Sequence, residues 1–383
     1  MINEEYKVCS KCVSDSSIPN LKLDKNNICQ YCKIHQEMEN EFPFNEKSLA
    51  NLKLIADKIR YEGKDKKYDC VVGISGGRDS SYLLYIVKEI LNLNPLAVHY
   101  DNGFDSETST SNILNVCSNL GVELETRVAD WENFKKITKS FFLAGVSDPD
   151  TPTDVGIFKT MYEIAYKENI KYVFNGHSFR TEGVEPLDWT YMDGLYVKSI
   201  NKKFENIDLD KFDNFTLFDL IKFNVLGGIK TILPLNYVEY DHQKVQEILT
   251  NKLGWTYYGG HHHESLLTKF VVSYYLPNKF GIDRRRTGLS AMVRSKKINR
   301  SEAIKILEKK PDIEDEKYLV DYILDKLDIS KDQFRNIMSK KNKNFRDFLT
   351  YYSFFKNFGL IAKFAYKVGF IPKLLYLRYY GKE

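Results

Sequence analysis

The middle of the chain alternates between short apolar runs and longer segments that mix apolar and polar residues. Four of the apolar runs have the length of β-strands, at residues 69–74, 96–100, 122–128 and 171–174. The segments between them carry apolar residues three or four positions apart, which predicts helices at residues 80–93, 107–120, 130–142 and 155–169. Strands that alternate with helices predict an α/β fold with an open parallel sheet covered on both faces.

The two ends of the chain follow other patterns. The first 40 residues are rich in turn-forming residues and show little helical periodicity, and a helix is predicted at 47–61. Beyond residue 241 helical spacing dominates, with helices predicted at residues 241–253, 264–276, 299–309, 314–327 and 345–355. Asn299 and Glu302 have the spacing of a capping box that would open the third of these. We therefore predict three domains: a cysteine module at 1–45, a nucleotide domain at 46–240, and a helical domain for substrate or partner binding at 241–383.

The segment VVGISGGRDSSYLL joins the first predicted strand of the sheet to the helix that follows it. Paired glycines let the backbone approach an anion closely, and the N-terminus of a helix offers N–H groups and a favourable dipole to phosphate. Neither the Walker pattern GxxxxGK(S/T) nor the dinucleotide pattern GxGxxG is present. We expect this loop to bind ATP phosphates, against the alternative of a glycine turn without a ligand. Its candidate ligands are Ser75, Gly76, Gly77, Asp79, Ser80 and Ser81, with Asp79 either capping the helix or holding Mg²⁺.

Polar residues also follow two other predicted strands. Asp101 and Asn102 end the second strand, and Gly176 and His177 come directly after the strand at 171–174. Ligands of open α/β sheets bind at the carboxyl ends of the strands, so Asp101, Gly176 and His177 are further candidates for nucleotide contacts. The alternative for His177 is a hydrogen-bonded histidine with a purely structural role.

Four of the six cysteines form two CxxC pairs. Two such pairs supply the four thiolates of a tetrahedral Zn²⁺ site, and a site with four protein ligands has no open position for catalysis. We predict structural zinc, with an iron–sulfur cluster or a redox role as alternatives. Cys70 lies in a predicted strand and Cys117 in a predicted helix, where core packing is the expected role. The predicted ligands are Cys9, Cys12, Cys29 and Cys32.

Composition and charge narrow the class of protein. The chain is 43% hydrophobic and 28% charged, and no apolar run reaches the length of a membrane-spanning helix. The start MINEEYK lacks the pattern of a secretory signal, and the paired cysteines suit a reducing compartment, so we expect a cytoplasmic protein. The net charge is only +4, yet residues 331–383 carry 12 Lys or Arg against 3 Asp or Glu. The tail at 360–382 mixes apolar and basic residues, as in a helix at a membrane surface, or as in a helix packed on the body with its lysines in water.

Several separate motifs together carry a family resemblance. The loop SGGRDSS matches the SGGxDS loop of the PP-loop ATP pyrophosphatases, which hold the β,γ-pyrophosphate of ATP and release it as PPi. With CSKCVSD…CQYC, NGHSFRTEG, and the segment from GGHHHES to LPNKFGIDRR, the chain resembles the N-acetyl sugar amidotransferases of bacterial surface-polysaccharide biosynthesis. These include the lipopolysaccharide (O-antigen) enzymes and those of the nonulosonic acids, pseudaminic and legionaminic acid. The resemblance covers roughly residues 5–305, and the last 75 residues carry no family motif.

The resemblance implies a reaction and a set of residues. An acetamido group of an N-acetyl sugar, nucleotide-activated or nonulosonic, would become an acetamidino group through an O-adenylated intermediate, with release of AMP and PPi and with Mg²⁺. Besides Asp79, the implied catalytic residues are Arg180, Glu182, His262 and Glu264, and the implied substrate-binding residues are Glu185, Lys279 and Arg285. Surface salt bridges or helix caps are the alternative roles for each. The chain shows no glutaminase of its own, so ammonia is expected free or from partner subunits similar to the glutaminase and cyclase of imidazole-glycerol-phosphate synthase.

Two other classes of function remain open from the sequence. A PP-loop enzyme that modifies RNA, such as a tRNA thiolase, would also join zinc knuckles to this loop, and the basic, aromatic tail could bind RNA. Against it, no cysteine lies well placed near the nucleotide, so no nucleic-acid partner is expected. A non-enzymatic docking subunit whose tail contacts a partner or a peripheral membrane surface is the second alternative, and it leaves the phosphate loop unexplained.

Overall fold

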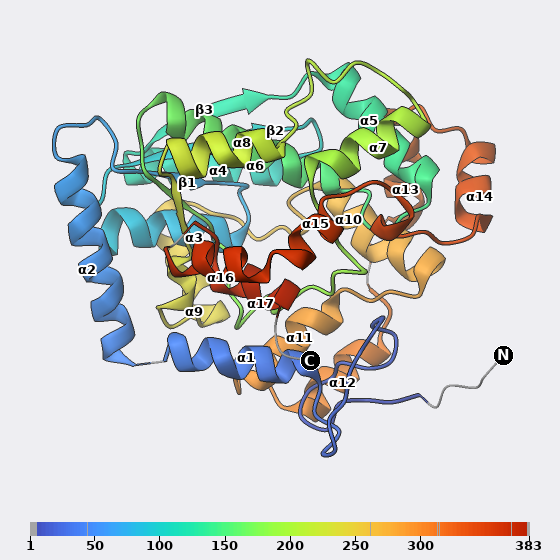
Figure 1. Ribbon diagram of the computed structural model, residues 1–383, viewed down its shortest axis with the longest axis horizontal. Coiled ribbons are helices and arrows are strands. Elements are labelled where there is room, and N and C mark those ends of the chain that lie inside the picture. The colour runs from blue at the N-terminus through green and yellow to red at the C-terminus, as the bar shows by residue number, and fades with distance from the viewer. Residues whose placement is uncertain are drawn as a thin grey trace.

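The computed structural model describes residues 6–380 except 44, 261, 312, 314 and 369. At its centre lies a parallel sheet of five strands in the order β3-β2-β1-β4-β5, with helices on both faces (Figure 1). Val71 of β1 pairs with Leu96 of β2 on one side and with Val173 of β4 on the other. The strands are β1 (Cys70–Gly73), β2 (Pro95–Asp101), β3 (Glu123–Val128), β4 (Tyr172–Phe174) and β5 (Lys230–Ile232).

The four strands predicted from apolar runs are confirmed, and the fifth was missed. Strand β5 has only three residues, KTI, and all three are partly exposed, so it carries no apolar run to detect. It follows a π-helical turn, η2 (Ile221–Leu226), which the sequence pattern did not predict either. The predicted α/β class with an open parallel sheet is therefore correct, and only the extent of the sheet was underestimated.

The helices predicted around the sheet are confirmed as α2 to α6, and α7 and α8 were not predicted. Polar side chains open several of them: Asn45, Ser106 and Asp130 each accept a hydrogen bond from a backbone N–H in the first turn of α2, α4 and α5. Gly121 ends α4 with a φ of 58°, a conformation that favours glycine. The bounds are α2 (Glu46–Gly63), α3 (Arg78–Tyr85) continued by the π-helical turn η1 (Ile86–Ile90), α4 (Glu107–Leu120), α5 (Trp131–Ala144), α6 (Thr151–Lys167), α7 (Gly194–Lys203) and α8 (Leu217–Leu220).

The first helix after the sheet belongs to the core of the nucleotide domain. Helix α9 (His242–Leu253) packs on α3 and α4, and its residues Val245, Leu249 and Leu253 lie in one buried cluster with β1 and β2. Trp255 is 1% exposed in the same cluster. The boundary predicted at residue 240 therefore falls inside one packed unit.

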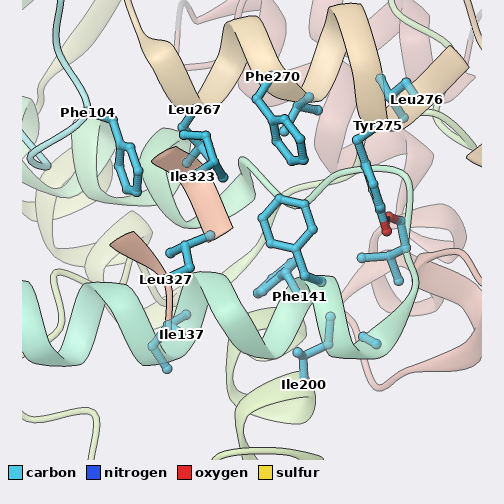
Figure 2. Packing of buried hydrophobic residues seen from close by; sticks show 14 of the residues in the cluster. Phe104, Ile137, Phe141, Ile200, Leu267, Phe270, Tyr275, Leu276, Ile323 and Leu327 are labelled. Atoms are coloured by element: carbon cyan, nitrogen blue, oxygen red, sulfur yellow. Dashed lines mark hydrogen bonds between the residues drawn. The ribbon is translucent and has the colours of Figure 1, made fainter. Parts of the chain in front are cut away.

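Several of the remaining C-terminal helices share a second core with the nucleotide domain. Figure 2 shows residues of α5 and α7 in contact range of residues from the later helices. Several of the later helices bury apolar residues there, so neither part packs its core alone. The later helices and turns are η3 (Pro234–Asn236), α10 (Leu266–Phe270), η4 (Val271–Phe280), α11 (Arg285–Arg294), α12 (Arg300–Glu308), α13 (Glu316–Lys326), α14 (Lys331–Ser339), η5 (Phe345–Asp347), α15 (Tyr352–Asn357), α16 (Gly359–Lys367) and α17 (Lys373–Tyr380). Of these, α11 and α12 pack in a separate small cluster, and α16 has no buried residue. The labelled side chains of Figure 2 are Phe104, Ile137, Phe141, Ile200, Leu267, Phe270, Tyr275, Leu276, Ile323 and Leu327.

Four local predictions are corrected by the structure. The cysteine module contains a helix, α1 (Gln30–Glu41), whose apolar face is only four residues and gave little periodicity. In the stretch between the helices predicted at 264–276 and 299–309, where the sequence pattern predicted no element, the chain forms helix α11. Asn299 does stand at the N-cap of α12, but its side chain makes no cap hydrogen bond, so there is no capping box. The helix predicted at 345–355 is two short pieces, and residue 314, which opened another predicted helix, lies outside the described residues.

None of the described helices is both long enough and apolar enough to cross a membrane.

Candidate functional site

The phosphate loop lies at the carboxyl end of β1, where the strand turns into α3. Its own side chains hold it in shape: Ser75 N donates to Ser80 Oγ at 3.2 Å, and Ser80 Oγ donates to Gly77 O at 3.1 Å. Gly77 N donates to Ser75 Oγ at 3.3 Å. Gly77 is also the N-cap of α3, and no side chain caps that helix. Asp79 therefore does not cap it, and the start of the helix is left open to an anion.

Gly76 has a conformation and surroundings that only glycine fits. Its φ is 74°, and a Cβ atom there would lie 2.3 Å from the carbonyl oxygen of Ser109 on α4. The carbonyl of Gly76 accepts hydrogen bonds from Trp255 Nε1 at 2.9 Å and from Asn112 Nδ2 at 3.3 Å. The loop backbone is thus held both by the loop's own serine side chains and by hydrogen bonds from Asn112 and Trp255. Ser81, a predicted ligand, is 0% exposed and lies behind the loop.

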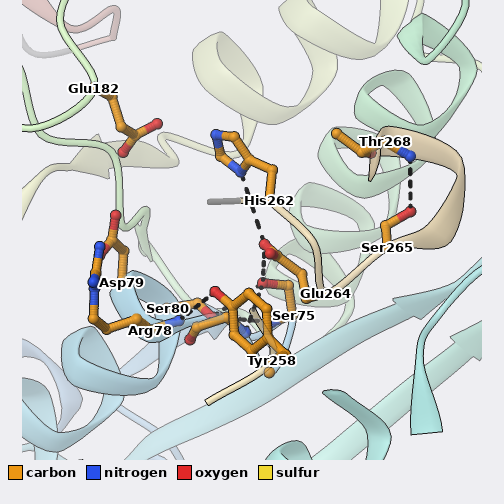
Figure 3. Close-up of polar contacts among 12 residues, drawn as sticks. Ser75, Arg78, Asp79, Ser80, Glu182, Tyr258, His262, Glu264, Ser265 and Thr268 are labelled. Atoms are coloured by element: carbon orange, nitrogen blue, oxygen red, sulfur yellow. Dashed lines mark hydrogen bonds and ion pairs between the residues drawn. The ribbon is translucent and has the colours of Figure 1, made fainter. Parts of the chain in front are cut away.

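A second segment, far away in the sequence, reaches the loop from the C-terminal side. Ser75 Oγ donates to Glu264 Oε1 at 3.5 Å, and a Cβ atom on Gly77 would lie 2.7 Å from the same oxygen. His262 Nδ1 lies 3.8 Å from Glu264 Oε1 (Figure 3). His262 has a φ of 61°, in the left-handed region that is uncommon for residues other than glycine and that occurs often at functional sites. The structure therefore brings together, beside the phosphate loop, two residues that the resemblance implied to be catalytic.

The charges of this pair depend on each other. Burial lowers the pKa of His262, but the hydrogen bond and negative charge of Glu264 outweigh it and raise the pKa to about 9. Glu182 adds to the increase. The pKa of Glu264 is lowered: burial raises it, and the bond and charge of His262 more than offset that effect. Near neutral pH the two residues form an imidazolium–carboxylate pair beside the loop.

Asp79 lies in a polar network of its own. The Tyr240 hydroxyl donates a hydrogen bond to Asp79 Oδ1, and Arg78 Nε lies 3.6 Å from the same oxygen. Burial and the negative charge of Glu182 raise the pKa of Asp79. Gly176 packs against this turn, since a Cβ atom there would lie 3.4 Å from the carbonyl carbon of Asp79. The predicted positions of Gly176 and Asp79 at one edge of the sheet are thus confirmed.

His177 and Glu182 form a second pair on the loop after β4. His177 Nδ1 donates to Glu182 Oε2 at 3.0 Å, and Ser178 N donates to Glu182 Oε1 at 3.2 Å. Burial lowers the pKa of His177, but the charge and hydrogen bond of Glu182 give a net increase. Figure 3 shows the Glu182 carboxylate and the His262 ring facing one another. The two pairs therefore line the same site.

Sequence reasoning missed part of this site. Arg284 Nη1 lies 3.4 Å from Asp150 Oδ2, and its Nε lies 3.7 Å from Glu185 Oε1, which also accepts a bond from Thr287 Oγ1 at 2.8 Å. Although burial opposes it, Glu185 and then Asp150 raise the pKa of Arg284. The Asp154 side chain is exposed to solvent in part. Loss of water around its carboxyl group, and then the negative charge of Asp150, raise its pKa to about 7. The segment DPDTPTD, with three aspartates within seven residues, was the signal that could have indicated these acids.

Two carboxylate oxygens of the site have no partner among the described residues. Glu264 Oε2 and Glu185 Oε2 are both buried without a hydrogen bond. An ionised carboxylate oxygen that is buried without a donor is costly, so each is suited to a donor supplied by a ligand.

Arg180 lies elsewhere. Its Nε donates to Glu39 Oε1 at 2.9 Å, and its Nη1 donates to the carbonyl oxygen of Asn236 at 2.8 Å. The guanidinium also stacks on the Phe179 ring, 4.4 Å from the ring centre. These contacts tie the cysteine module to the loop after β4, and they support a structural role more than a catalytic one.

Two of the predicted substrate-binding residues, Lys279 and Arg285, make contacts with residues other than Asp150 and Glu185. Lys279 Nζ donates to the carbonyl oxygen of Lys340 at 2.8 Å. Arg285 pairs with Asp283 at 2.7 Å and donates to the carbonyl oxygen of Lys309 at 2.6 Å. The structure brings Glu185 to the site, but through Arg284 and not through Arg285.

A cavity of about 290 Å³ lies at the carboxyl end of β2, and Leu124 and Thr126 of β3 also line it. Asp101, a predicted nucleotide ligand, lines it, and Asp101 Oδ1 accepts a hydrogen bond from Gly103 N at 2.8 Å. His99 connects this cavity to the loop, since its Nδ1 donates to the carbonyl oxygen of Ile74 at 3.0 Å. The full lining is His99, Asp101, Gly103, Asp105, Thr110, Ile113, Leu114, Leu124 and Thr126.

The four paired cysteines converge in the N-terminal module. Cys9 and Cys32 Sγ atoms lie 3.8 Å apart, and Cys12 and Cys29 Sγ atoms lie 3.7 Å apart. A tetrahedral ion with metal–sulfur bonds of about 2.3 Å would separate its ligands by about 3.8 Å. The cluster therefore fits a single tetrahedral metal ion, with all four ligands buried.

Arginines from the C-terminal helices hold this module in place. Arg294 of α11 donates to Cys12 Sγ at 3.2 Å, to Cys32 Sγ at 3.3 Å and to Ser14 Oγ at 3.0 Å. Arg300 donates to the carbonyl oxygen of Cys12 at 3.0 Å. A buried guanidinium beside the thiolates offsets their negative charge and supports a metal–thiolate site.

Two family models match separate parts of the chain. Residues 50–144 match the family described as NAD synthase, and residues 264–364 match the one described as LPS biosynthesis protein WbpG-like, C-terminal domain. The chain joins a PP-loop nucleotide domain to a WbpG-like C-terminal domain. The WbpG-like match begins at Glu264, the residue that reaches the phosphate loop, so the two domains meet at the site. The resemblance found in the sequence is therefore confirmed for these two domains, the PP-loop domain and the WbpG-like domain of LPS biosynthesis.

Individual relatives cover less of the chain. An uncharacterized protein of Methanocaldococcus jannaschii, MJ1599, is 28% identical over 170 residues, which are 44% of this chain and 58% of that protein. The tRNA-specific 2-thiouridylase MnmA 2 of Fusobacterium nucleatum subsp. nucleatum is 28% identical over 188 residues, 46% of this chain and 49% of that protein. The alignments thus span about half the length of these curated relatives. The U34-tRNA thiolase NcsA of Methanococcus maripaludis, solved with its 4Fe-4S cluster, is 17% identical with a TM-score of 0.32, covering 80% of this chain and 90% of that one.

The pair at the junction of the PP-loop and WbpG-like domains gives a testable pH dependence. Because the pKa of His262 is raised to about 9, the stabilisation from its charged form is complete below about pH 6.5 and is lost as the pH rises through about 9. An NMR titration of the His262 ring should have its midpoint near 9, and Glu264→Gln should lower it toward or below 6.5. A midpoint near 6.5 in the unaltered protein would contradict the pairing.

Proposed function

We propose that the protein is an ATP-dependent amidotransferase that converts the acetamido group of an N-acetyl sugar to an acetamidino group in surface-glycan biosynthesis. One observation supports this above the others. Glu264, the first residue of the WbpG-like match, accepts a hydrogen bond from Ser75 of the phosphate loop, and His262 lies 3.8 Å from Glu264. A substrate carried by the second domain would therefore meet the α-phosphate of ATP at the domain junction.

The proposed reaction has two steps. The acetamido oxygen attacks the α-phosphorus of ATP, the bond to the β,γ-pyrophosphate breaks, and the amide proton is lost, which leaves an O-adenyl imidate and PPi. Ammonia then attacks the imidate carbon, and the carbon–oxygen bond breaks with AMP as the leaving group. The oxygen of the sugar amide ends in AMP, and nitrogen replaces it in the product.

The residues of the site suit these steps. Amides at the start of α3 would bind the departing pyrophosphate, and the His262 imidazolium would stabilise negative charge at the reacting phosphate. Asp154, with a pKa of about 7 and access to solvent, would take a proton from the attacking ammonia. Mg²⁺, when bound, would neutralise phosphate charge, and Asp79 is the loop carboxylate positioned to hold it. The unpartnered oxygens of Glu264 and Glu185 would accept bonds from the sugar or from ammonium.

The metal of the cysteine module is proposed to be Zn²⁺ in a structural role. Four thiolate ligands would leave such an ion no open position for catalysis, and the hydrogen bond from Arg294 to Cys12 Sγ supports a structural site. We further propose that ammonia comes from partner subunits, because neither cysteine outside the module has the exposure that a glutaminase nucleophile needs.

The same cysteines argue against a thiolase that uses a reactive thiol. Cys70 is 0% exposed and Cys117 is 4% exposed. Burial raises the pKa of Cys70, and it raises the pKa of Cys117 to about 12. Neither thiol is available as a thiolate near the nucleotide.

The function is tested by product analysis. The purified chain is incubated with ATP, Mg²⁺, ¹⁵N-ammonium chloride and a panel of N-acetylated sugars, free and nucleotide-activated. The expected result is AMP, PPi and ¹⁵N-labelled product in equal amounts, for one class of sugar. Glutamine in place of ammonium should give no product. Accumulation of ADP, or turnover with glutamine alone, would contradict the proposal.

A further inference from the structure

Helix α8 and the turn η2 expose an unusual amount of apolar surface. Phe218 is 72% exposed, Ile221 47%, Val225 59% and Leu226 75%. The opposite face of the same turn is buried through Phe223 and Asn224. The exposed residues at 218, 221 and 225 follow helical spacing, so they form one stripe that nothing in the described part of the chain covers.

The C-terminal helices α15 and α16 carry a second stripe of this kind. Neither helix has a fully buried residue. Leu360 is 86% exposed, Ile361 62% and Phe364 64%, and Phe354 and Phe358 are exposed just before them. Water-exposed leucine, isoleucine and phenylalanine in such a group mark an interaction surface.

The two stripes lie on neighbouring elements. Asn224 Nδ2 of η2 donates a hydrogen bond to the carbonyl oxygen of Phe370, between α16 and α17, at 3.3 Å. In Figure 1 α8 and α16 both lie on the side of the molecule turned toward the viewer, α8 in the upper layer with the sheet and α16 below it. We call the two stripes together the apolar face.

The charged side chains on α15, α16 and α17 are all basic, and Glu41 of α1 is an acid beside them that contacts Tyr366 and Lys373. Residues 348–380 contain five Lys or Arg and no Asp or Glu. Lys356, Lys363 and Lys367 are exposed along α15 and α16. On α8, which carries part of the other stripe, the acidic residue is Asp219. Its side chain is buried, and its charge is neutralised by Lys159 at 2.7 Å. Apolar side chains ringed by lysines match the boundary between acyl chains and anionic headgroups of a bilayer.

We propose that the apolar face docks this protein on a membrane surface that contains anionic phospholipids. The apolar side chains would enter the headgroup region, and the lysines would contact phosphate groups. Such docking would hold the enzyme at the surface without a spanning helix. The inference depends on the exposed residues of these helices alone, and it stands independently of the proposed reaction.

Vesicle binding by the full chain tests the inference. The protein is sedimented with vesicles of phosphatidylcholine alone and with vesicles that also contain phosphatidylglycerol. We expect binding to the second kind, weakened by added salt. The combined variant Leu360→Ser, Ile361→Ser and Phe364→Ser should bind at least about tenfold more weakly. The variant Lys356→Gln, Lys363→Gln and Lys367→Gln should bind both kinds of vesicle equally weakly.

A matched control is available on another surface. Leu54 and Tyr61 on α2 are 66% and 74% exposed, and Leu54→Ser with Tyr61→Ser should leave vesicle binding unchanged. Thermal melting should be the same for all variants, since every altered residue is exposed. Equal binding by the serine and control variants, no binding to either vesicle, or a change of oligomeric state in place of vesicle binding would overturn the proposal.

Discussion

Glu264→Gln is expected to lower the kcat of ammonium-dependent AMP formation by about 100-fold or more. Glutamine keeps the shape of the side chain but removes the charge that holds the His262 pKa at about 9. At neutral pH the imidazole would then be largely unprotonated, and positive charge would be lost beside the reacting phosphate. The measurement is initial rate of PPi release at saturating ATP, together with the Kd for ATP, which should change little.

A double-mutant cycle separates this pair from independent effects. If His262 and Glu264 act as one unit, His262→Gln should lower kcat about as much as Glu264→Gln does. The double variant should have a kcat no lower than that of either single variant. Glu302→Gln, at an exposed position of α12, is the matched control and should retain full activity. Full activity in Glu264→Gln, or additive losses in the double variant, would contradict the role given to the pair.

Cys12→Ser is expected to abolish metal binding and to destabilise the protein strongly. Cys12 Sγ is one of four converging thiolates and also accepts a hydrogen bond from Arg294. Losing it removes a ligand and leaves a buried guanidinium poorly paired. We expect a loss of roughly 3 kcal/mol, which corresponds to about 6–12 °C in Tm for a domain of 150–250 residues.

The effect of this substitution should reach the active site. Arg294 and Arg284 lie on and directly before the same helix, α11, so loosening the module would move the arginine that faces Asp150 and Glu185. Zinc content by elemental analysis and thermal melting give the readouts. Cys117→Ala, buried in α4 and distant in sequence from the module, is the control: it should keep one metal ion per chain and lose about 1–2 kcal/mol. A Cys12→Ser protein with full metal content and unchanged Tm would refute the predicted site.

The parts of the fold that could be predicted are those with strong local periodicity. The four longer apolar runs became β1 to β4, and helix α4 has the bounds that the pattern gave. Strand β5 and helix α11 were missed for a physical reason. β5 is three partly exposed residues that form a strand because β4 pairs with them, and at the start of α11 Arg284 and Arg286 pair with Asp150 and Asp15 from other parts of the chain.

The same division applies to the site. The positions of the glycine loop, Asp101, Gly176 and His177 could be predicted because a parallel sheet brings the ends of its strands to one edge. Arg284 could not be separated from Arg285 and Arg286 by sequence, since three consecutive arginines point in different directions and only packing decides which one faces Asp150. Asp154 was overlooked because two of the charged residues that act on it, Arg284 and His262, are far from it along the chain.

The sequence by itself determined the chemistry that is local: the glycine turn that fits phosphate, the two CxxC pairs, and the alternation that makes a parallel sheet. Each depends on residues within a few positions of one another. Only the tertiary structure decided that Glu264 and His262 reach the phosphate loop, that Arg180 ties the cysteine module to the body, and that Arg294 covers the thiolates. Those contacts join residues 141 to 282 positions apart. Contacts across such separations form only when burial of a shared core brings their elements together.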